Sequence, residues 1–252
     1  MIKFFRRIRQ QLLADNRLGK YVLYAVGEIV LVVIGILIAL QLNRMREEQQ
    51  DRAKELSYLK EINLDFKYNK QQLDSILDFN AGSLKAGLKL DSLMTIMKRD
   101  VAVKDHPNYP MNDSMFSYQS RLFTNLSFNP KNGSVRALIN SSSFDLIQND
   151  SLRRMLISWN DVLGDYLEEE GFNMKFLFDE YYPWQRDVYE FEKPYSPENM
   201  AVWLGPKEYN FRWHRIGSLD YLLQVVEDEG VVQMIDGIIR LTEKEMDDDH
   251  DL

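Results

Sequence analysis

The sequence predicts an all-α protein with a single N-terminal transmembrane helix that continues into a helical stalk and a helical extracytoplasmic domain. Three observations predict this fold class. Val22–Leu40 is an apolar run of nineteen residues that contains one charged residue. Residues 43–77 contain no proline or glycine and are rich in strong helix formers. No useful length of sequence shows the alternation of apolar and polar residues that is typical of a half-buried strand.

Residues 1–20 are predicted to form a basic amphipathic segment on the cytoplasmic side of the membrane. They carry a net charge of +5, which leaves −13 on the other 232 residues. Apolar residues recur there at helical spacing, and Arg6, Arg7 and Arg9 lie between them. We expect these arginines to contact anionic lipid headgroups, although a basic flank that only sets topology explains the pattern equally well. The acidic remainder argues against nucleic acid as a partner.

Residues 21–42 are predicted to be the transmembrane helix. At about 1.5 Å per residue the apolar run spans roughly 28 Å, which is about one hydrocarbon core of a bilayer. The run is longer than the apolar region of a signal peptide and ends without a small-x-small pair, so we expect an uncleaved anchor. Six basic residues precede the run and four follow closely. This bias predicts an inner-membrane protein with a cytoplasmic N-terminus and a periplasmic C-terminal domain.

Glu28 is the one charged residue within the apolar run. At about 100° per residue, Gly35 and Ala39 return to the face of Glu28. Small residues let two membrane helices approach closely, and a polar side chain among them can hydrogen-bond across the contact. The stripe of Glu28, Gly35 and Ala39 therefore predicts a helix–helix interface, with either a homo-oligomer or another membrane protein. Two alternatives are a carboxylate that reaches toward the cytoplasmic interface and a proton or ion relay.

The most distinctive part of the sequence is the membrane block GEIVLVVIGILIALQ, which ends at Gln41. Together with the block that begins at Met1, it resembles a family of uncharacterised single-pass membrane proteins from Bacteroidota, catalogued as a domain of unknown function. Leu146–Arg153 resembles a sequence segment at which a helix begins in that family. The resemblance implies an inner-membrane protein with a helical periplasmic domain. It implies no activity, substrate or catalytic residue.

Residues 43–252 are predicted to form the periplasmic domain, and residues 43–98 within it a helical hairpin or stalk. An apolar seam with spacings of three and four runs along the first part: Leu59, Ile62, Phe66, Asn69, Leu73 and Ile76. Such a seam indicates either a coiled coil, whose register Asn69 could fix, or a helix that packs on its own domain. Asn80–Ser83 is expected to break the helix. The second, antiparallel helix would carry Leu84, Leu88, Leu93, Ile96 and Met97.

Residues 99–252 are predicted to form a helical bundle. Its expected elements are a helix from Asp113, a short helix from Ser134 to Ile139, a long helix capped by Asp150 or Ser151 and stopped by Pro183, a helix that starts at Ser196-Pro197, and closing helices over 219–226 and 231–241. Thirteen aromatic residues lie between Phe172 and Trp213. We expect them to form core, because aromatics dominate burial in small domains; a sugar- or peptide-binding surface is the alternative.

The motifs of enzymes and cofactor proteins are missing from this sequence. It has no cysteine, and His106, His214 and His250 are isolated, so no metal site is predicted. Glu168–Glu170 reads as the solvent-facing side of a helix. We therefore expect no cofactor and no enzymatic activity. The predicted function is a membrane-anchored assembly, scaffold or sensing component that works through oligomerisation and periplasmic protein contacts. The alternatives are a subunit of an ion-coupled membrane complex that uses Glu28, and a periplasmic ligand-binding module.

Overall fold

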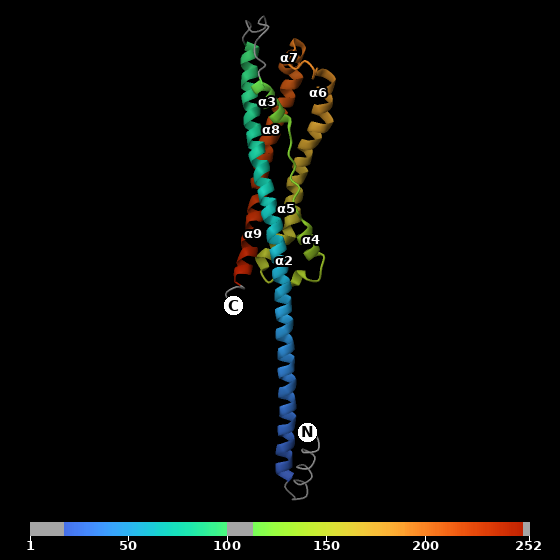
Figure 1. Cartoon of the computed structure of the whole chain (residues 1–252), viewed down its shortest axis with the longest axis vertical. Helices are drawn as coiled ribbons and strands as arrows, with labels where there is room; N and C mark the ends of the chain where they lie inside the picture. The colour runs from blue at the N-terminus through green and yellow to red at the C-terminus, as the bar shows by residue number, and fades with distance from the viewer. Residues whose placement is uncertain (1–17, 100–112, 249–252) are drawn as a thin grey trace. The chain divides into compact units, whose positions relative to one another are not determined.

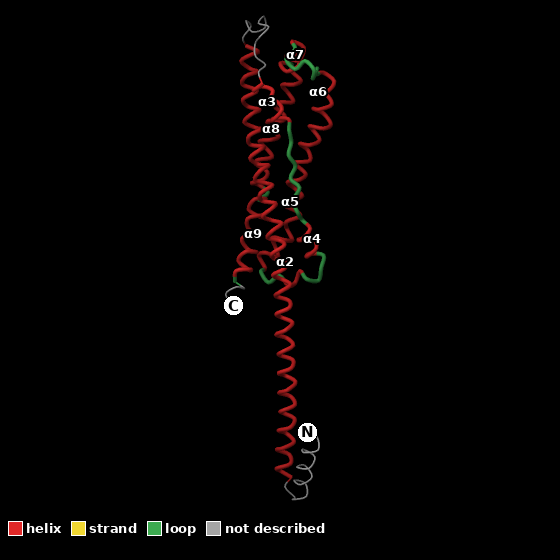
Figure 2. The backbone as a smooth tube through the Cα atoms, viewed as in Figure 1, coloured by secondary structure: helices red, strands yellow, loops and turns green. Residues whose placement is uncertain are grey.

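The computed structural model describes residues 18–99 and 113–248. All regular elements in these ranges are helices, which confirms the predicted all-α class (Figure 2). The chain divides into two units, Met1–Glu55 and Leu56–Leu252. Helix α2 (Leu18–Arg99) contributes to both units. The compact second unit therefore begins later than the predicted domain boundary at residue 43.

In the first unit, α2 carries the apolar run. Its most apolar 18-residue window has a mean hydropathy of 2.7, and none of that window is buried. A core helix of a soluble protein would bury much of such a surface. This part of α2 is long and apolar enough to cross a membrane, and it is a candidate membrane span.

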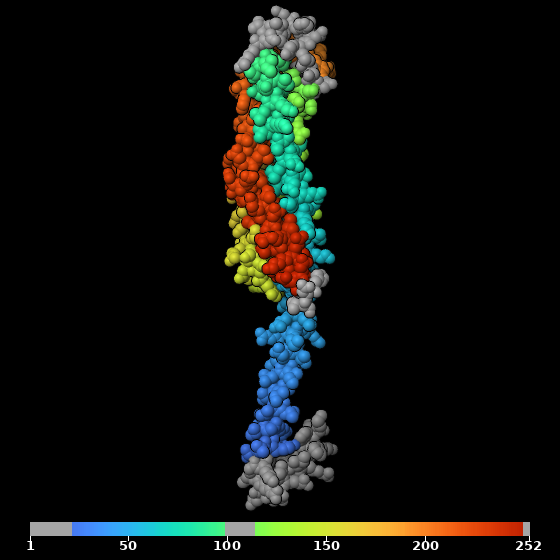
Figure 3. All heavy atoms as spheres, turned by 90° about the vertical axis from the view of Figure 1, so that its left-hand side faces the viewer, coloured from blue at the N-terminus to red at the C-terminus, as the bar shows by residue number. Residues whose placement is uncertain are grey.

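In the second unit, the seam of α2 is the packing face of the helix. All six predicted seam residues are buried, and five belong to a core cluster with α5 (Asp150–Lys175) and α9 (Val231–Asp247). Phe66 meets Trp159 of α5 edge to face, with ring centroids 4.9 Å apart. Figure 3 shows α2 and α9 side by side along one face of this unit. The interpretation that the seam packs on its own domain is confirmed.

Of the two alternatives predicted for residues 43–98, a helical hairpin or a stalk, the hairpin is wrong, because α2 continues without a break through Asn80–Ser83. Asn80 and Ser83 are buried, and the Ser83 hydroxyl donates a hydrogen bond to the Phe79 carbonyl of the preceding turn. Gly82 accommodates the guanidinium of Arg121, which occupies the space that a Cβ would need. Glycine here serves close packing between helices and does not end one.

The seam of α2 in fact extends at the same spacing through Asn80, Ser83, Gly87, Leu90, Met94 and Met97, all of which are buried. Leu88, Leu93 and Ile96, which were expected to pack as a second helix, are instead exposed. The polar and small residues in the middle of the seam hid this continuity from a reading of apolar positions alone.

The remaining helices are α3 (Asp113–Phe123), α4 (Gly133–Ile139), the 3₁₀ turn η2 (Phe144–Leu146), the π-helix η3 (Phe176–Tyr181), α6 (Tyr182–Val188), α7 (Pro197–Leu204) and α8 (Pro206–Asp228). Figure 1 shows their arrangement. The starts of α3 and α7 agree with the prediction, and the last two helices are split at Gly230, which has a φ of 69°. The N-cap of α5 is Asn149, one residue before the predicted cap; its Oδ1 accepts from the backbone N–H groups of Ser151 and Leu152.

Pro183 does not stop the helix as predicted. The π-helical turn η3 follows α5 directly and leads into α6, where Pro183 lies in the first turn. A proline is tolerated in a first turn because its missing N–H is not needed there. The wider π-helical turn carries the chain from α5 into α6 without an interruption.

The aromatic-rich region from Phe172 to Trp213 divides between core and surface. Phe176, Tyr181, Tyr189 and Trp203 are buried in two clusters that also contain α2 and α3 residues. More than half of the side-chain surface is exposed at four others: Phe172, Phe178, Phe191 and Tyr195. The prediction of core is therefore confirmed for only part of this set.

Glycines of the domain helices provide a test of this packing. A Cβ at Gly87 would lie 2.7 Å from Leu122 Cδ1 and 2.9 Å from Ile216 Cγ1, whereas a Cβ at Gly217 would meet nothing within 4 Å. We expect Gly87→Ala to lower the free energy of unfolding by about 1–3 kcal/mol through overpacking. Gly217→Ala should raise it by about 0.5–1 kcal/mol through helix propensity. Denaturant unfolding of the detergent-solubilised chain measures both, and equal effects would contradict the described α2–α3–α8 contact.

Candidate functional site

The predicted membrane stripe lies on the described part of α2, within the candidate span. Glu28 is partly buried and Ala39 is exposed. A Cβ at Gly35 would meet nothing within 4 Å, so nothing in the described chain covers this glycine. Arg6, Arg7 and Arg9, which were predicted to contact headgroups, lie outside the described residues. The structure thus places the stripe on one helix and leaves the surface of Gly35 open.

The second unit contains an unusual element for a helical bundle, a non-helical segment over residues 124–132 between α3 and α4 (Figure 1). No strand lies beside it among the described residues, so its peptide groups need other partners. Asn69 of α2 supplies two of them. Its Oδ1 accepts from Lys131 N at 2.7 Å, and its Nδ2 donates to Lys131 O at 2.9 Å. The polar seam residue singled out from the sequence therefore fixes this segment and not a coiled coil.

Side chains of α5 and α8 hold the same segment from the other side. The Phe128 N–H donates to both carboxylate oxygens of Glu170, at 3.0 and 3.2 Å. Arg215 donates to the carbonyls of Leu122 and Thr124, at 3.0 and 3.1 Å, and to Asn173 Oδ1 at 2.8 Å. A completely buried guanidinium is thereby paired with carbonyl and amide oxygens at the end of α3.

The prediction that Glu170 faces solvent is wrong, because this residue is 6% exposed. Burial raises the pKa of Glu170, and the hydrogen bond from the Phe128 N–H opposes part of that rise. A signal for this burial was present in the sequence. Glu170 continues the helical spacing of Leu163 and Tyr166, both of which are buried on the same face of α5.

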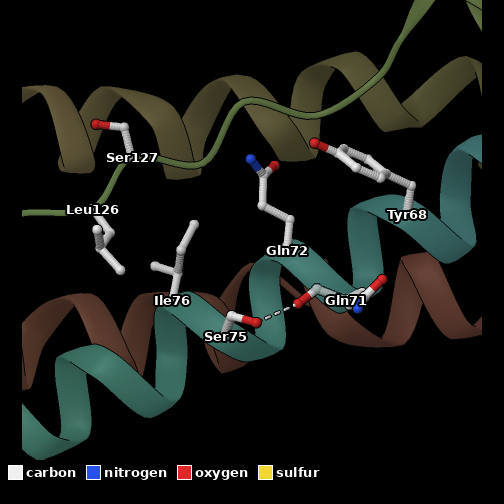
Figure 4. Close-up of a pocket in the computed structure, with 7 residues that line it drawn as sticks. All are labelled: Tyr68, Gln71, Gln72, Ser75, Ile76, Leu126 and Ser127. Carbon is white, nitrogen blue, oxygen red and sulfur yellow. Dashed lines mark hydrogen bonds between the residues drawn. The ribbon is translucent and has the colours of Figure 1, made fainter.

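A groove with a volume of about 430 Å³ lies between α2 and residues 124–132, which we call the extended segment. Figure 4 shows Gln72 and Ile76 pointing from α2 toward the segment, and Leu126 pointing back. Its lining is uncharged: Tyr68, Gln71, Gln72, Ser75, Ile76, Leu126 and Ser127. Amide and hydroxyl groups beside apolar side chains suit an uncharged polar ligand. They offer no acid or base that titrates near neutral pH.

A second set of polar groups is buried between α2, α3, η3 and α8, and we call it the polar cluster: Asp91, Gln119, Tyr181, Glu208 and Arg212. Gln119 Nε2 donates to the Tyr181 hydroxyl at 2.7 Å and also to Glu208 Oε1. Arg212 Nε donates to Asp91 Oδ1 at 3.2 Å. The two Nη atoms of Arg212 are buried and have no hydrogen-bond partner among the described residues.

Glu208 is the chemically unusual member of the polar cluster. It is 1% exposed, and burial raises its pKa to about 7, against the opposing effects of the Gln119 hydrogen bond and the Arg212 charge. The sequence reading missed Glu208 and Arg212. Extending the spacing of Leu219, Leu222 and Val226 back along α8 would have placed both on its buried face.

The described residues do not bring the groove and the polar cluster together, since the two share no residue. In the described part of the chain no group of three or more His, Asp or Glu side chains could hold a metal ion. The expectation that the protein is not an enzyme stays a prediction.

Comparison with known proteins gives one match. The profile of a family of unknown function (DUF6090) matches residues 28–161, which are 134 of the 252 residues. The match includes the extended segment and Leu146–Arg153, the sequence segment that resembles this part of the family. Residues 1–27 and the α8 residues of the polar cluster lie outside the match. No curated protein and no solved structure matches the chain.

The stabilisation of the extended segment by the hydrogen bonds of Asn69 can be tested with Asn69→Ala. The change leaves the N–H and C=O of Lys131 without their partner, and we expect the free energy of unfolding to fall by about 1–3 kcal/mol. Gln72→Ala is the matched control, because Gln72 makes a single, exposed hydrogen bond to the Asn129 N–H. Its effect should stay under about 1 kcal/mol. Denaturant unfolding gives both values, and equal losses would argue against the role of Asn69.

Glu170 makes stability depend on pH. Its folded-state pKa is raised above the ordinary 4.5, so the folded chain keeps a proton that the unfolded chain releases. The contribution of Glu170 is therefore largest below pH 4.5 and falls as pH rises through the raised pKa. Glu170→Gln should flatten the pH profile of the unfolding free energy over this window. Glu168→Gln, at an exposed position of α5, should leave the profile unchanged. Identical profiles for all three proteins would contradict the prediction.

Proposed function

Since this chain belongs to the DUF6090 family, whose function is unknown, we propose a role for it from its own structure. The protein is a non-enzymatic assembly, scaffold or sensing component of the inner membrane. Its N-terminus lies in the cytoplasm, α2 crosses the bilayer, and the helical domain lies in the periplasm. It works by associating through the membrane helix and by protein contacts of the domain.

The observation that carries this proposal is the different use of the two parts of α2. The seam from Leu59 to Met97 is buried in the core of its own domain, so this face is not available for a coiled coil between chains. In the candidate span, by contrast, no residue from Val22 to Leu42 is fully buried, and the face of Gly35 is open. Lipid covers most of such a helix well, but the stripe of Glu28, Gly35 and Ala39 suits a second helix better.

The ligand-binding alternative rests on the groove beside the extended segment. Its amide and hydroxyl lining supports an uncharged ligand of modest size. The ion-relay alternative has less support, because Glu28 is the single charged residue between Val22 and Leu42 and a relay needs several ionisable groups along its path.

The association is tested by the native mass of the complex extracted from membranes. A Cβ at Gly35 meets nothing within the described chain, so Gly35→Leu does not disturb the described structure and acts through other molecules. We expect a discrete oligomer or a co-purifying membrane protein in the wild type, and its loss in Gly35→Leu and Glu28→Gln.

Gly27→Leu is the matched control for this measurement. Gly27 also has open space around its Cβ position, but it lies about 100° away from Glu28 on the helix. The control should keep the wild-type mass. A monomer in every sample, or the same loss in the control, would refute an interface at the stripe.

A further inference from the structure

Several of the described elements place polar or titratable groups around Glu208. Gln119 of α3 contacts it directly, and the Tyr181 hydroxyl of η3 contacts the same amide. Burial raises the pKa of Tyr189, after α6, and the charge of nearby Glu208 adds to this rise. The buried residues of α7 are Asn199 and Trp203, neither of which titrates. Lys98 of α2 lies over the ring of the neighbouring Tyr209, 5.1 Å from its centroid.

In these surroundings the carboxyl group of Glu208 has one hydrogen-bond partner among the described residues, a neutral amide. Tyrosine and glutamine do not compensate a negative charge, and an uncompensated buried carboxylate is costly. The described arrangement therefore suits the protonated acid. It links α8 to α3 and, through Gln119, to η3.

The ionised acid has a different partner available. Arg212 lies one turn further along α8, at the spacing that lets side chains of a helix pair. Its Nε is engaged by Asp91, while Nη1 and Nη2 are buried without a partner among the described residues. An ionised Glu208 that turns toward these groups gains a charge-assisted hydrogen bond and satisfies them. A rotation that takes Oε1 to these groups removes it from the Gln119 amide.

We propose that Glu208 is a proton-operated switch. When it loses its proton to solvent, its carboxylate moves from Gln119 of α3 to the Nη groups of Arg212. This movement loosens the packing of α3 and η3 against α8. The side chain of Glu208 has two positions, and the packing of α3 changes between them. The switch does not depend on the membrane association proposed above.

The position of Glu208 in the core sets where the switch operates. Burial raises its pKa from the ordinary 4.5 to about 7. The folded domain therefore holds a proton between these values that the unfolded chain has released, and this contribution to stability falls as pH rises from 4.5 to about 7. Near neutral pH the ratio of ionised to protonated acid changes tenfold per pH unit, so a small change of pH outside the cell membrane would move the population.

Hydrogen exchange of the full-length protein in detergent tests the proposal. Protection factors of the α3 amides are compared with those of α9 between pH 6 and 8, after correction for the intrinsic exchange rate. In the wild type we expect α3 protection to fall about tenfold or more over this range, while α9 stays constant. Glu208→Gln holds the neutral arrangement and should keep α3 protected throughout. Glu198→Gln, exposed on α7, should behave as the wild type.

The same pH dependence in the wild type and in Glu208→Gln would overturn the switch. Should the Glu208→Gln variant not fold, infrared titration of the wild type decides the question, with Glu170→Gln measured beside it to assign the signal. A protonated carboxyl band that disappears between pH 6 and 8 and survives Glu170→Gln supports the switch. Absence of any such band in the wild type overturns it.

Discussion

The extended segment 124–132 is the constraint on which the rest of the domain depends. A helix satisfies its own peptide groups, but an extended chain inside a helical bundle has no neighbouring strand to pair with. Many of its hydrogen bonds come from side chains of the surrounding helices. Asn69, Glu170 and Arg215 are the buried polar residues that supply them. Each of them lies on the buried face of its helix. The domain therefore has a core with polar residues at fixed points, which determines the register of α2, α5 and α8 around one segment.

Helix α2 combines two different uses of a helical surface. Between Leu59 and Met97 one face, repeated at spacings of three and four, is buried throughout. Asn80, Ser83 and Gly87 belong to this face. At Gly87, α3 and α8 approach so closely that a Cβ would collide with Leu122 and Ile216. Between Val22 and Leu42 the helix is apolar on all sides and has no covering from the described chain. The domain part is complete within one chain, while the candidate span presents a surface for lipid or for another helix.

The raised pKa values of three buried groups in this domain have a common cause. Those of Glu170, Tyr181 and Glu208 are all raised, and burial is the largest cause in each case. An active site would more often combine burial with a paired charge in a cleft. Here the groove is uncharged and the titrating acid is enclosed among Gln119, Tyr181 and Arg212. The titrating acid therefore lies apart from the groove, as the proposed conformational role of Glu208 requires.

The sequence by itself determined the helical class, the apolar span, the seam of α2 and most helix starts. These follow from local properties, namely hydropathy, the period of 3.6 residues and the preference of serine, asparagine and proline for helix starts. The tertiary structure decided that Asn80–Ser83 continue a helix, that Pro183 follows a π-helical turn, and that Glu170 and Glu208 are buried. Three of these outcomes involve a distant residue: Arg121 beside Gly82, the Phe128 N–H at Glu170, and Gln119 at Glu208. Local preference cannot specify a partner that lies 39 to 89 residues away along the chain, because only the folded arrangement brings that partner near.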